Sequence, residues 1–254
     1  MKIDILKALI SPKYSIIIDM GAVRTIVITG ATGGIGQTIV KKLASGTNQL
    51  VLVGRNLEAL DKIVEKKSIT PPVVSFAVDL ENKSARKQLC DDLVAQFGTI
   101  DWVIHSAGFV SKEDSISKLD LEVTQKTFEI NFFAALDLTT RLNDHISEAG
   151  GSIFISSTAG LSGNGFVPAY ASAKGALNTF AKSLALSWQG SAKRSVTICP
   201  GPTNTPMREY LAGDSAEQQS PSVIAREICQ IIEDAKTYPN GSTLLIRDEK
   251  TSFV

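Results

Sequence analysis

Residues 25–36 read TIVITGATGGIG, an apolar, β-branched run that passes directly into a glycine-rich turn. β-branched residues bounded by glycine are typical of a buried strand, so residues 25–29 are expected to form one. The glycines let the backbone turn tightly and let an anion approach the N–H groups that open a helix over residues 34–45. The alternative is a glycine-rich turn that binds no ligand. The stretch predicts a site for a dinucleotide pyrophosphate, formed by Gly30, Thr32, Gly33, Gly34, Ile35 and Gly36.

The rest of the chain alternates short apolar runs with helical patterns. Further strands are expected at residues 50–53, 73–78, 102–104, 152–156, 196–199 and 243–246, and helices at 57–67, 83–97, 119–147, 168–189 and 221–235. Fully apolar strands between helices indicate a parallel sheet that is covered on both faces and joined by right-handed crossovers. The pattern predicts an α/β fold with a single doubly wound, Rossmann-type domain over residues 25–254. We expect a seven-stranded parallel sheet with helices on both faces.

Residues 1–24 precede this alternation and are expected to form an N-terminal extension. Their apolar positions suit a short amphipathic helix followed by an apolar arm. Three interpretations remain open: a packed extension, a non-native start upstream of Met20, and a contact with a second subunit or a membrane.

The composition excludes several classes of protein. The chain has 254 residues, 43% of them hydrophobic, and a formal net charge of +0, so its charge does not predict a nucleic-acid partner. Three widely spaced cysteines and two histidines predict neither a disulfide framework nor a metal site. No apolar run reaches the roughly 18 residues of a membrane span, so we expect no integral span and a cytoplasmic protein.

The end of the second expected strand, Val53-Gly54-Arg55-Asn56, bears on the choice of dinucleotide. An NAD site usually has an acidic residue there, which accepts a hydrogen bond from the ribose 2′-hydroxyl. Arg55 can instead pair with a 2′-phosphate, and no carboxylate repels that group. The sequence therefore favours NADP(H) over NAD(H), and the alternative is a solvated surface arginine.

The ends of the third and fourth strands supply further candidate cofactor contacts. Asp79 has two interpretations, an acceptor for the adenine amino group and a helix N-cap. His105 is expected to be a packed histidine and not a catalytic one. The small residues that follow it would let a cofactor lie close to the fourth strand. The candidate contacts are Asp79, Leu80, Ser106, Ala107 and Gly108.

Three polar residues further along the chain suggest acid/base chemistry. Tyr170 and Lys174 stand one helical turn apart and share a face, and Ser157 ends the fifth strand. A lysine cation, or a positively charged nicotinamide ring, would stabilise the phenolate and lower the pKa of Tyr170 from about 10. Tyr170 would then serve as general acid for a carbonyl or base for an alcohol, while Ser157 binds the same substrate oxygen. The alternative is a buried tyrosine, a surface lysine and a strand-end serine without a joint role.

Taken together, these residues resemble the classical short-chain dehydrogenase/reductase family over about residues 24–247. The resemblance rests on the glycine motif, Asp79, Ala107-Gly108, Asn131, Ser157, Tyr170, Lys174 and Pro200-Gly201. It implies a catalytic tetrad of Asn131, Ser157, Tyr170 and Lys174, in which Asn131 distorts its helix and holds a water that links Lys174 to solvent. It also implies cofactor contacts from Tyr170 and Lys174 and from a nicotinamide-side loop with Pro200, Gly201, Thr203 and Thr205.

Two segments depart from the family's pattern. The family's Asn-Asn-Ala-Gly is His105-Ser106-Ala107-Gly108 here, in a motif that mainly stabilises the central sheet. The segment between Met207 and Pro221 is short where the family often has a long substrate loop. The substrate pocket is therefore expected to be open, or to be completed by a partner subunit or by the N-terminal extension.

The combined features predict an NADPH-dependent oxidoreductase that interconverts a carbonyl and an alcohol of a small molecule by hydride transfer. Two alternatives remain: a catalytically silent NADP(H)-binding sensor or scaffold on the same fold, and a family member that performs epimerisation or dehydration. The intact tetrad argues against the first, and the ordinary surroundings of Tyr170 argue against the second.

A homodimer or homotetramer is also expected. The helices predicted at 119–147 and 168–189 supply more apolar surface than one core-facing stripe uses, and a two-fold interface would cover it. The alternative is that both helices wedge deeply between the sheet and its neighbours. The residues concerned are Phe132, Phe133, Ala134, Leu136, Leu177, Asn178, Phe180 and Ala181.

Overall fold

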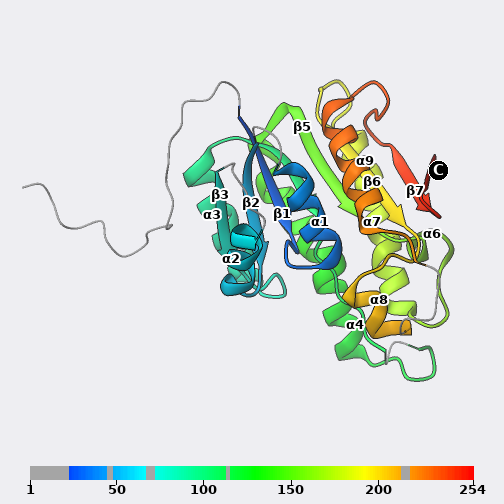
Figure 1. The fold of residues 1–254 in the computed structure, drawn as a ribbon. Coiled ribbons are helices and arrows are strands. Elements are labelled where there is room, and N and C mark those ends of the chain that lie inside the picture. Colours follow the sequence, from blue (N-terminus) through cyan, green and yellow to red (C-terminus); the bar gives the residue numbers. More distant parts are fainter. Residues whose placement is uncertain (1–22, 45–47, 67–71, 113–114, 213–217) are drawn as a thin grey trace, which may run out of the picture.

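The computed structural model describes residues 23–44, 48–66, 72–112, 115–212 and 218–254, so nearly all of the expected N-terminal extension lies outside the described part. The described residues form one sheet with helices on both faces (Figure 1). Its strands are β1 (Arg24–Thr29), β2 (Asn48–Gly54), β3 (Val73–Ala77), β4 (Ile100–His105), β5 (Ile146–Ile155), β6 (Arg194–Pro200), β7 (Thr243–Arg247) and β8 (Lys250–Phe253).

The strand order confirms the doubly wound α/β fold. Neighbouring strands follow the order β3-β2-β1-β4-β5-β6-β7-β8, and the pairs from β3 to β7 are all parallel. The chain reverses its direction of winding between β1 and β4. The carboxyl ends of these two strands therefore border the crevice where such folds bind ligands.

The eighth strand is an addition that the sequence pattern did not predict. β8 pairs antiparallel with β7 through a two-residue turn. In that turn Asp248 and Glu249 have φ angles of 51° and 60°. Such hairpin turns usually contain Asn or Gly at these positions, so the local signal for a hairpin is missing.

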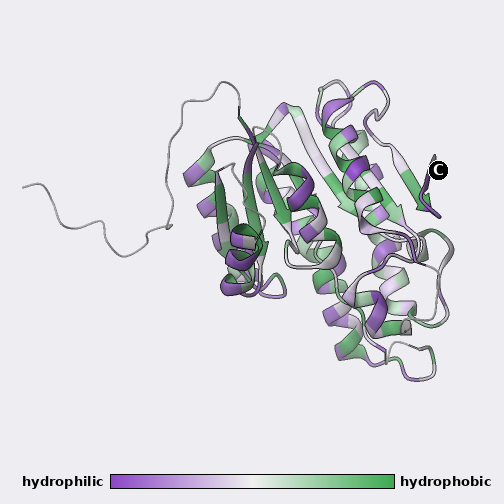
Figure 2. Cartoon of the chain, viewed as in Figure 1, coloured by the Kyte–Doolittle hydropathy of each residue, from purple (hydrophilic) through white to green (hydrophobic). Residues whose placement is uncertain are grey.

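The helices lie in two layers. On one face of the sheet pack α1 (Gly34–Leu43), α2 (Leu57–Lys66) and α9 (Pro221–Glu233), and on the other pack α3 (Lys83–Phe97), α5 (Ala134–Leu142) and α7 (Pro168–Ser187). Side chains alternate along each strand, so Ile26 and Ile28 of β1 join the first layer while Val27 joins the second. Figure 2 shows the result as hydrophobic strands between helices with hydrophilic outer faces.

The long helix expected over residues 119–147 is interrupted and ends early. It consists of α4 (Leu121–Phe128), a π-helical turn (Glu129–Phe133), α5 and a 3-10 turn (Asn143–His145), and β5 already begins at Ile146. The polar residues at the start of β5 form a strand because they pack closely against β4 and β6. A Cβ at Gly150 or Gly151 would lie 1.9 Å from the carbonyl oxygen of Asp101 or Arg194 respectively, so only glycine permits this approach. Two short helices, α6 (Ala159–Ser162) and α8 (Pro206–Ala212), were also not predicted.

A buried arginine joins α3 to the interrupted helix. The Arg86 side chain is 2% exposed, with Nη2 lying 2.7 Å from a Glu129 carboxyl oxygen and Nε lying 2.8 Å from one of Asp137. Its Nη1 also donates a hydrogen bond of 2.6 Å to the carbonyl oxygen of Leu80. Arg86 thus fixes the π-helical turn relative to the segment that follows β3.

The described part of the chain lacks two further kinds of feature. None of its helices is both long and apolar enough to cross a membrane. Within the same residues, no three His, Cys, Asp or Glu side chains gather in an arrangement that would hold a metal ion.

Candidate active site

Two cavities open at the carboxyl edge of the sheet. The first, here called the β1–β4 cavity, has a volume of about 280 Å³. This volume is close to the lower end of the range of roughly 300–1,000 Å³ that is usual for small-molecule sites. The cavity brings together most of the predicted cofactor contacts: Gly30, Thr32, Gly33, Gly34, Ile35, Gly36, Arg55, Asp79, Leu80, Ser106, Ala107, Gly108 and Thr205.

The glycine turn after β1 is packed so closely that side chains have no room. Gly30 has a φ of +65°, and a Cβ there would lie 2.7 Å from the backbone nitrogen of Ala107. A Cβ at Gly36 would lie 2.1 Å from the carbonyl oxygen of Gly30. The Thr29 hydroxyl accepts hydrogen bonds from the N–H groups of Ser106 and Ala107, at 3.1 and 3.2 Å. The ends of β1 and β4 and the start of α1 are therefore locked together at the cavity wall.

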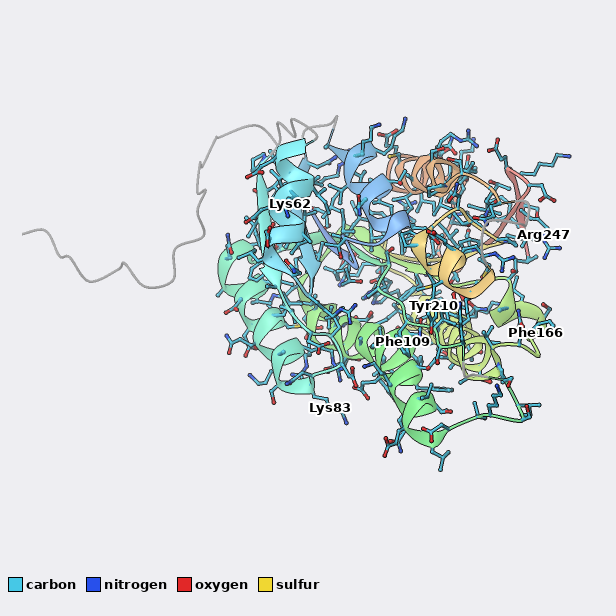
Figure 3. All side chains as sticks on the ribbon, turned by 60° about the horizontal axis from the view of Figure 1, so that its bottom comes forward. Lys62, Lys83, Phe109, Phe166, Tyr210 and Arg247 are labelled. Atoms are coloured by element: carbon cyan, nitrogen blue, oxygen red, sulfur yellow. The ribbon has the colours of Figure 1, made fainter. Side chains whose placement is uncertain are left out.

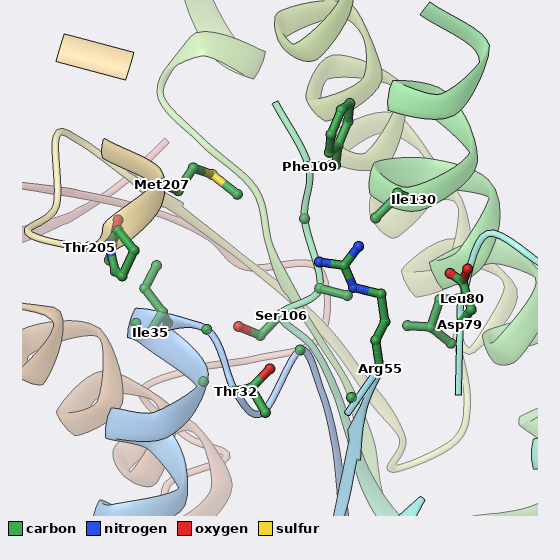
Figure 4. A pocket seen from close by; sticks show the side chains of 18 of the residues that line it. Thr32, Ile35, Arg55, Asp79, Leu80, Ser106, Phe109, Ile130, Thr205 and Met207 are labelled. Atoms are coloured by element: carbon green, nitrogen blue, oxygen red, sulfur yellow. The ribbon is translucent and has the colours of Figure 1, made fainter. Parts of the chain in front are cut away.

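The residues of the β1–β4 cavity fit a nucleotide cofactor. Gly33, the N-cap of α1, offers no side-chain cap to the first N–H groups of that helix, which suits a bound phosphate. The Ser106 hydroxyl oxygen is buried and has no hydrogen-bond partner among the described residues. Figure 4 shows Arg55 reaching into the cavity, with Ser106 on one side and Asp79 on the other. A cation, an unpaired hydroxyl and an uncapped helix match the phosphates and sugar hydroxyls of such a ligand.

The structure excludes one of the two interpretations of Asp79. The N-cap of α3 is Asn82, whose side chain accepts a hydrogen bond of 3.0 Å from the N–H of Ala85. The helix-cap interpretation of Asp79 is therefore wrong. Asp79 accepts a hydrogen bond from the N–H of Glu81 at 3.0 Å and lines the β1–β4 cavity beside Leu80.

The second cavity, here called the tyrosine cavity, has a volume of about 170 Å³. It adjoins the first, since Ile35, Thr205 and Met207 line both. Tyr170 of α7 and Ser157, which follows β5, meet in it and form a hydrogen bond. The predicted loop residues Pro200, Gly201, Thr203 and Thr205 line the same cavity. A ligand in the first cavity would thus reach the space beside the tyrosine hydroxyl.

Burial shifts the pKa values of Tyr170 and Lys174, and that of Tyr170 moves in the direction opposite to the one expected from the sequence. Burial raises the pKa of the Tyr170 hydroxyl to about 12, although its hydrogen bond with Ser157 acts to lower it. Burial also lowers the pKa of Lys174 to about 8. The Lys174 Nζ donates to the carbonyl oxygen of Ile155 at 2.8 Å and lies 5.7 Å from the centre of the Tyr170 ring. The expected lowering of the tyrosine pKa is wrong for the chain by itself, because burial outweighs the hydrogen bond with Ser157.

Asn131 lies in the π-helical turn, at a distorted point of its helix. Its amide nitrogen donates to the carbonyl oxygens of Phe109 and Thr127, at 2.7 and 2.8 Å. Its amide oxygen accepts from the N–H of Phe109 at 3.2 Å. Asn131 lines neither the β1–β4 cavity nor the tyrosine cavity. It lies near Gly108, where a Cβ would be 3.2 Å from the Asn131 Oδ1 and 4.0 Å from the Lys174 Nζ.

His105 is a packed residue, as expected. Its ring stacks on Phe154 with the ring centres 4.8 Å apart, and its Nε2 lies 3.1 Å from the Thr139 hydroxyl. Burial, and secondarily the charge of Lys174, lowers the pKa of His105 to about 3. The imidazole is therefore neutral at physiological pH and takes no part in the cavities.

Several cavity residues were missed at the level of the sequence. Some of them lie on α8, and Pro206 could have indicated this helix, because proline is favoured at the first position of a helix. The missed lining residues include Phe109 and Ile130 of the β1–β4 cavity, Met207 of both cavities, and Asn164, Arg208 and Leu211 of the tyrosine cavity.

Comparisons with known proteins agree with this geometry. The family model described as short chain dehydrogenase matches residues 24–216. An uncharacterised oxidoreductase of Staphylococcus epidermidis is 29% identical over 216 residues, which cover 84% of this chain and 91% of that protein. A benzil reductase of Saccharomyces cerevisiae is 26% identical over 73% of this chain and 74% of its own. The structure of a short chain dehydrogenase from Shigella flexneri, in complex with NADP, is 28% identical and superimposes with a TM-score of 0.78 over 87% of this chain and 96% of that one.

The buried ammonium of Lys174 makes the stability of the fold depend on pH. Its pKa falls from 10.5 to about 8 on folding, so the unfolded chain binds more protons between these pH values. The contribution of Lys174 to the free energy of unfolding therefore rises with pH through this window, and is least favourable below it. The free energy of unfolding is measured by urea titration for the native protein and for Lys174→Met. The native value should rise relative to the value for Lys174→Met as the pH increases from about 8 to about 10.5.

The control is Lys182→Met, which changes an exposed lysine of the same helix. Its effect on the free energy of unfolding should be the same at both ends of the pH window. A constant difference for Lys174→Met as well would contradict a lowered pKa for Lys174.

Proposed function

Because the chain belongs to the short-chain dehydrogenase/reductase family, we propose that it is an NADPH-dependent oxidoreductase that interconverts a carbonyl and an alcohol of a small molecule. The observation that carries the proposal is the meeting of Tyr170 and Ser157 in a cavity that adjoins the β1–β4 cavity. The catalytic domain of this proposal is residues 25–254.

The acid/base step is assigned to Tyr170. A bound nicotinamide dinucleotide supplies the hydride that reduces the carbonyl carbon. Tyr170, whose pKa is about 12, holds a proton at its hydroxyl oxygen and donates it to the substrate oxygen as that atom becomes an alkoxide. Ser157 already bonds the tyrosine, and it would stabilise the same oxygen by a second hydrogen bond. Hydride and proton together convert the carbonyl to an alcohol.

Lys174 and Asn131 are assigned supporting roles. With a pKa of about 8, Lys174 is largely protonated at neutral pH and lies 5.7 Å from the tyrosine ring. Its positive charge would stabilise the phenolate that forms when Tyr170 gives up its proton. Asn131 holds the backbone at Phe109 through two hydrogen bonds and so positions the neighbouring Gly108.

The preference for NADP(H) over NAD(H) rests on Arg55. The arginine follows β2 directly and reaches into the β1–β4 cavity (Figure 4), and the end of that strand carries no carboxylate. A guanidinium in this place would pair with a 2′-phosphate. Asp79, on the far side of the cavity, remains our candidate acceptor for the adenine amino group.

Self-association is a further proposal, and fewer of the expected residues are exposed on the described surface than the sequence suggested. Ala134, Leu177, Asn178 and Ala181 are buried within the chain, so these residues belong to the core. Phe132 packs edge-on against Phe180, with the ring centres 6.3 Å apart. Phe133, in contrast, is 43% exposed and offers apolar surface on the π-helical turn. We propose that a second subunit covers it.

Substitution of the tyrosine tests the mechanism. Tyr170→Phe removes the transferable proton but keeps the ring, so turnover of a ketone identified by an NADPH-oxidation screen should fall by roughly 10²- to 10⁴-fold. Cofactor binding, followed by fluorescence titration, should change little. Tyr238→Phe is the matched control, since Tyr238 lines neither cavity and its hydroxyl donates to Glu227 of α9, and it should leave turnover unchanged. Unchanged turnover in Tyr170→Phe would refute the mechanism and favour a protein that binds NADP(H) without catalysis.

The choice of cofactor is tested by comparing kcat/KM for NADPH and NADH. The native protein should prefer NADPH, and Arg55→Ala should reduce that preference by about 10- to 100-fold, the range of one lost charge-assisted hydrogen bond. Arg226→Ala, an exposed arginine of α9 outside both cavities, should keep the native preference. A native preference for NADH would overturn the assignment.

Light scattering at micromolar concentration tests self-association. The proposal expects a dimer or tetramer, and Phe133→Ser should weaken it by placing a polar side chain in the interface. Leu57→Ser, which changes an exposed apolar residue of α2 on the other face of the sheet, should not. A native protein that scatters with the mass of one chain, 27.2 kDa, would exclude self-association.

A further inference from the structure

The tyrosine cavity has an uneven distribution of charge. Its wall is made mainly of apolar and hydroxyl-bearing residues, and among the described residues that line it Arg208 is the single one with a full charge at neutral pH. Arg208 belongs to α8 and lines this cavity but not the β1–β4 cavity. A permanent cation thus shares a cavity of about 170 Å³ with the Tyr170 hydroxyl.

Within the described part of the chain, no carboxylate holds the Arg208 guanidinium. Its Nε is buried without a hydrogen-bond partner among the described residues, and no carboxylate in that part of the chain forms an ion pair with it. Two buried arginines have more partners. Arg86 has two carboxylate partners, and Arg194, whose Nε also has no partner among the described residues, donates from Nη1 to the carbonyl oxygens of Ile231 and Tyr238. An unpaired donor on a charged group is costly, which points to a partner that arrives with a ligand.

The backbone beneath Arg208 is fixed from two sides. The Arg208 N–H donates to the carbonyl oxygen of Thr205 at 2.9 Å, which ties α8 to the loop after β6. At the other side of α8, the Tyr210 hydroxyl accepts from the N–H of Lys112 at 3.4 Å, and the Lys112 ammonium lies 4.7 Å from the Tyr210 ring centre. Figure 3 shows Tyr210 next to the segment that carries Phe109. Arg208 is therefore held in place at the wall of the cavity.

We propose that Arg208 binds a carboxylate of the substrate, so that the preferred substrates are oxo acids or hydroxy acids and not neutral ketones or alcohols. The inference rests on the proposed function, because it places the reacting carbonyl at Tyr170 and Ser157. A planar guanidinium matches the two oxygens of a carboxylate, and the apolar surroundings strengthen the pairing. Arg55 is the corresponding cation of the β1–β4 cavity, which leaves Arg208 for the substrate.

The test compares oxo acids with their methyl esters. A series is chosen in which the carboxylate lies at increasing distance from the ketone, and kcat/KM for NADPH oxidation is measured for each acid and its ester. The native protein should prefer the best acid over its ester by about 10- to 100-fold, as a charge-assisted hydrogen bond would give. Arg208→Gln should bring this ratio close to one, and Arg208→Lys should retain part of it. Arg226→Gln, on α9, is the matched control and should keep the native ratio.

A binding measurement separates this inference from the proposed function. Calorimetric titration of the best oxo acid into the protein with NADP⁺ should give heat of binding that is lost in Arg208→Gln but kept in Tyr170→Phe. Equal turnover of acids and esters by the native protein, with Tyr170-dependent rates, would overturn the carboxylate site and leave the proposed function intact. A raised KM for NADPH in Arg208→Gln with an unchanged acid-to-ester ratio would instead assign Arg208 to the cofactor. Binding of the acid without any NADPH oxidation would support the site and refute the proposed reaction.

Discussion

The close approach of the backbone after β1 to the backbone after β4 is the constraint on which the site depends. Gly30 has no room for a side chain against Ala107, and Gly36 has none against the Gly30 carbonyl oxygen. The Thr29 hydroxyl closes the same contact by accepting from two N–H groups of the β4 end. Because these atoms touch, α1 starts at the cavity wall with its first N–H groups uncapped. Arg55, Asp79 and Ser106 then surround the same space, since β2 and β4 pair in register with β1, and β3 pairs in register with β2.

The acid/base half of the site is governed by burial. Tyr170 and Lys174 both lie away from water, and burial favours the neutral form of each, so their pKa values shift in opposite directions. The tyrosine binds its proton more tightly than in water, and the lysine binds its proton less tightly. The proton affinities of the two groups thereby move apart, from pKa values of 10.0 and 10.5 to about 12 and about 8. Transfer of the tyrosine proton to Lys174 is therefore costly in free energy, which favours a reaction in which that proton passes to the substrate oxygen.

The parts of the fold that were predictable have local signals. Strands such as β2 are buried on both faces, so a continuous apolar run marks them, and the glycine turn marks the ligand edge. The start of β5 has no such signal, because its polar residues become a strand through contacts with Asp101 and Arg194, which are distant in sequence. The same holds for the site. Spacing predicted that Tyr170 and Lys174 share a helix face, but the direction of the tyrosine pKa depends on burial, and the role of Arg208 depends on which groups surround it.

The π-helical turn at Glu129–Phe133 has a consequence for the length of this helix in related chains. A π-turn accommodates one residue more than an α-turn, and its Glu129 and Asn131 make contacts with Arg86 and Thr127. Deletion of one residue from the turn would let α4 and α5 join as a regular α-helix with both flanking faces kept, because the turn absorbs the extra residue locally. The residues of the turn itself, Asn131 among them, would then change direction. An alignment of this chain with a relative whose helix is regular therefore needs a one-residue gap within the turn, and a gap placed elsewhere would pair unrelated positions across the site.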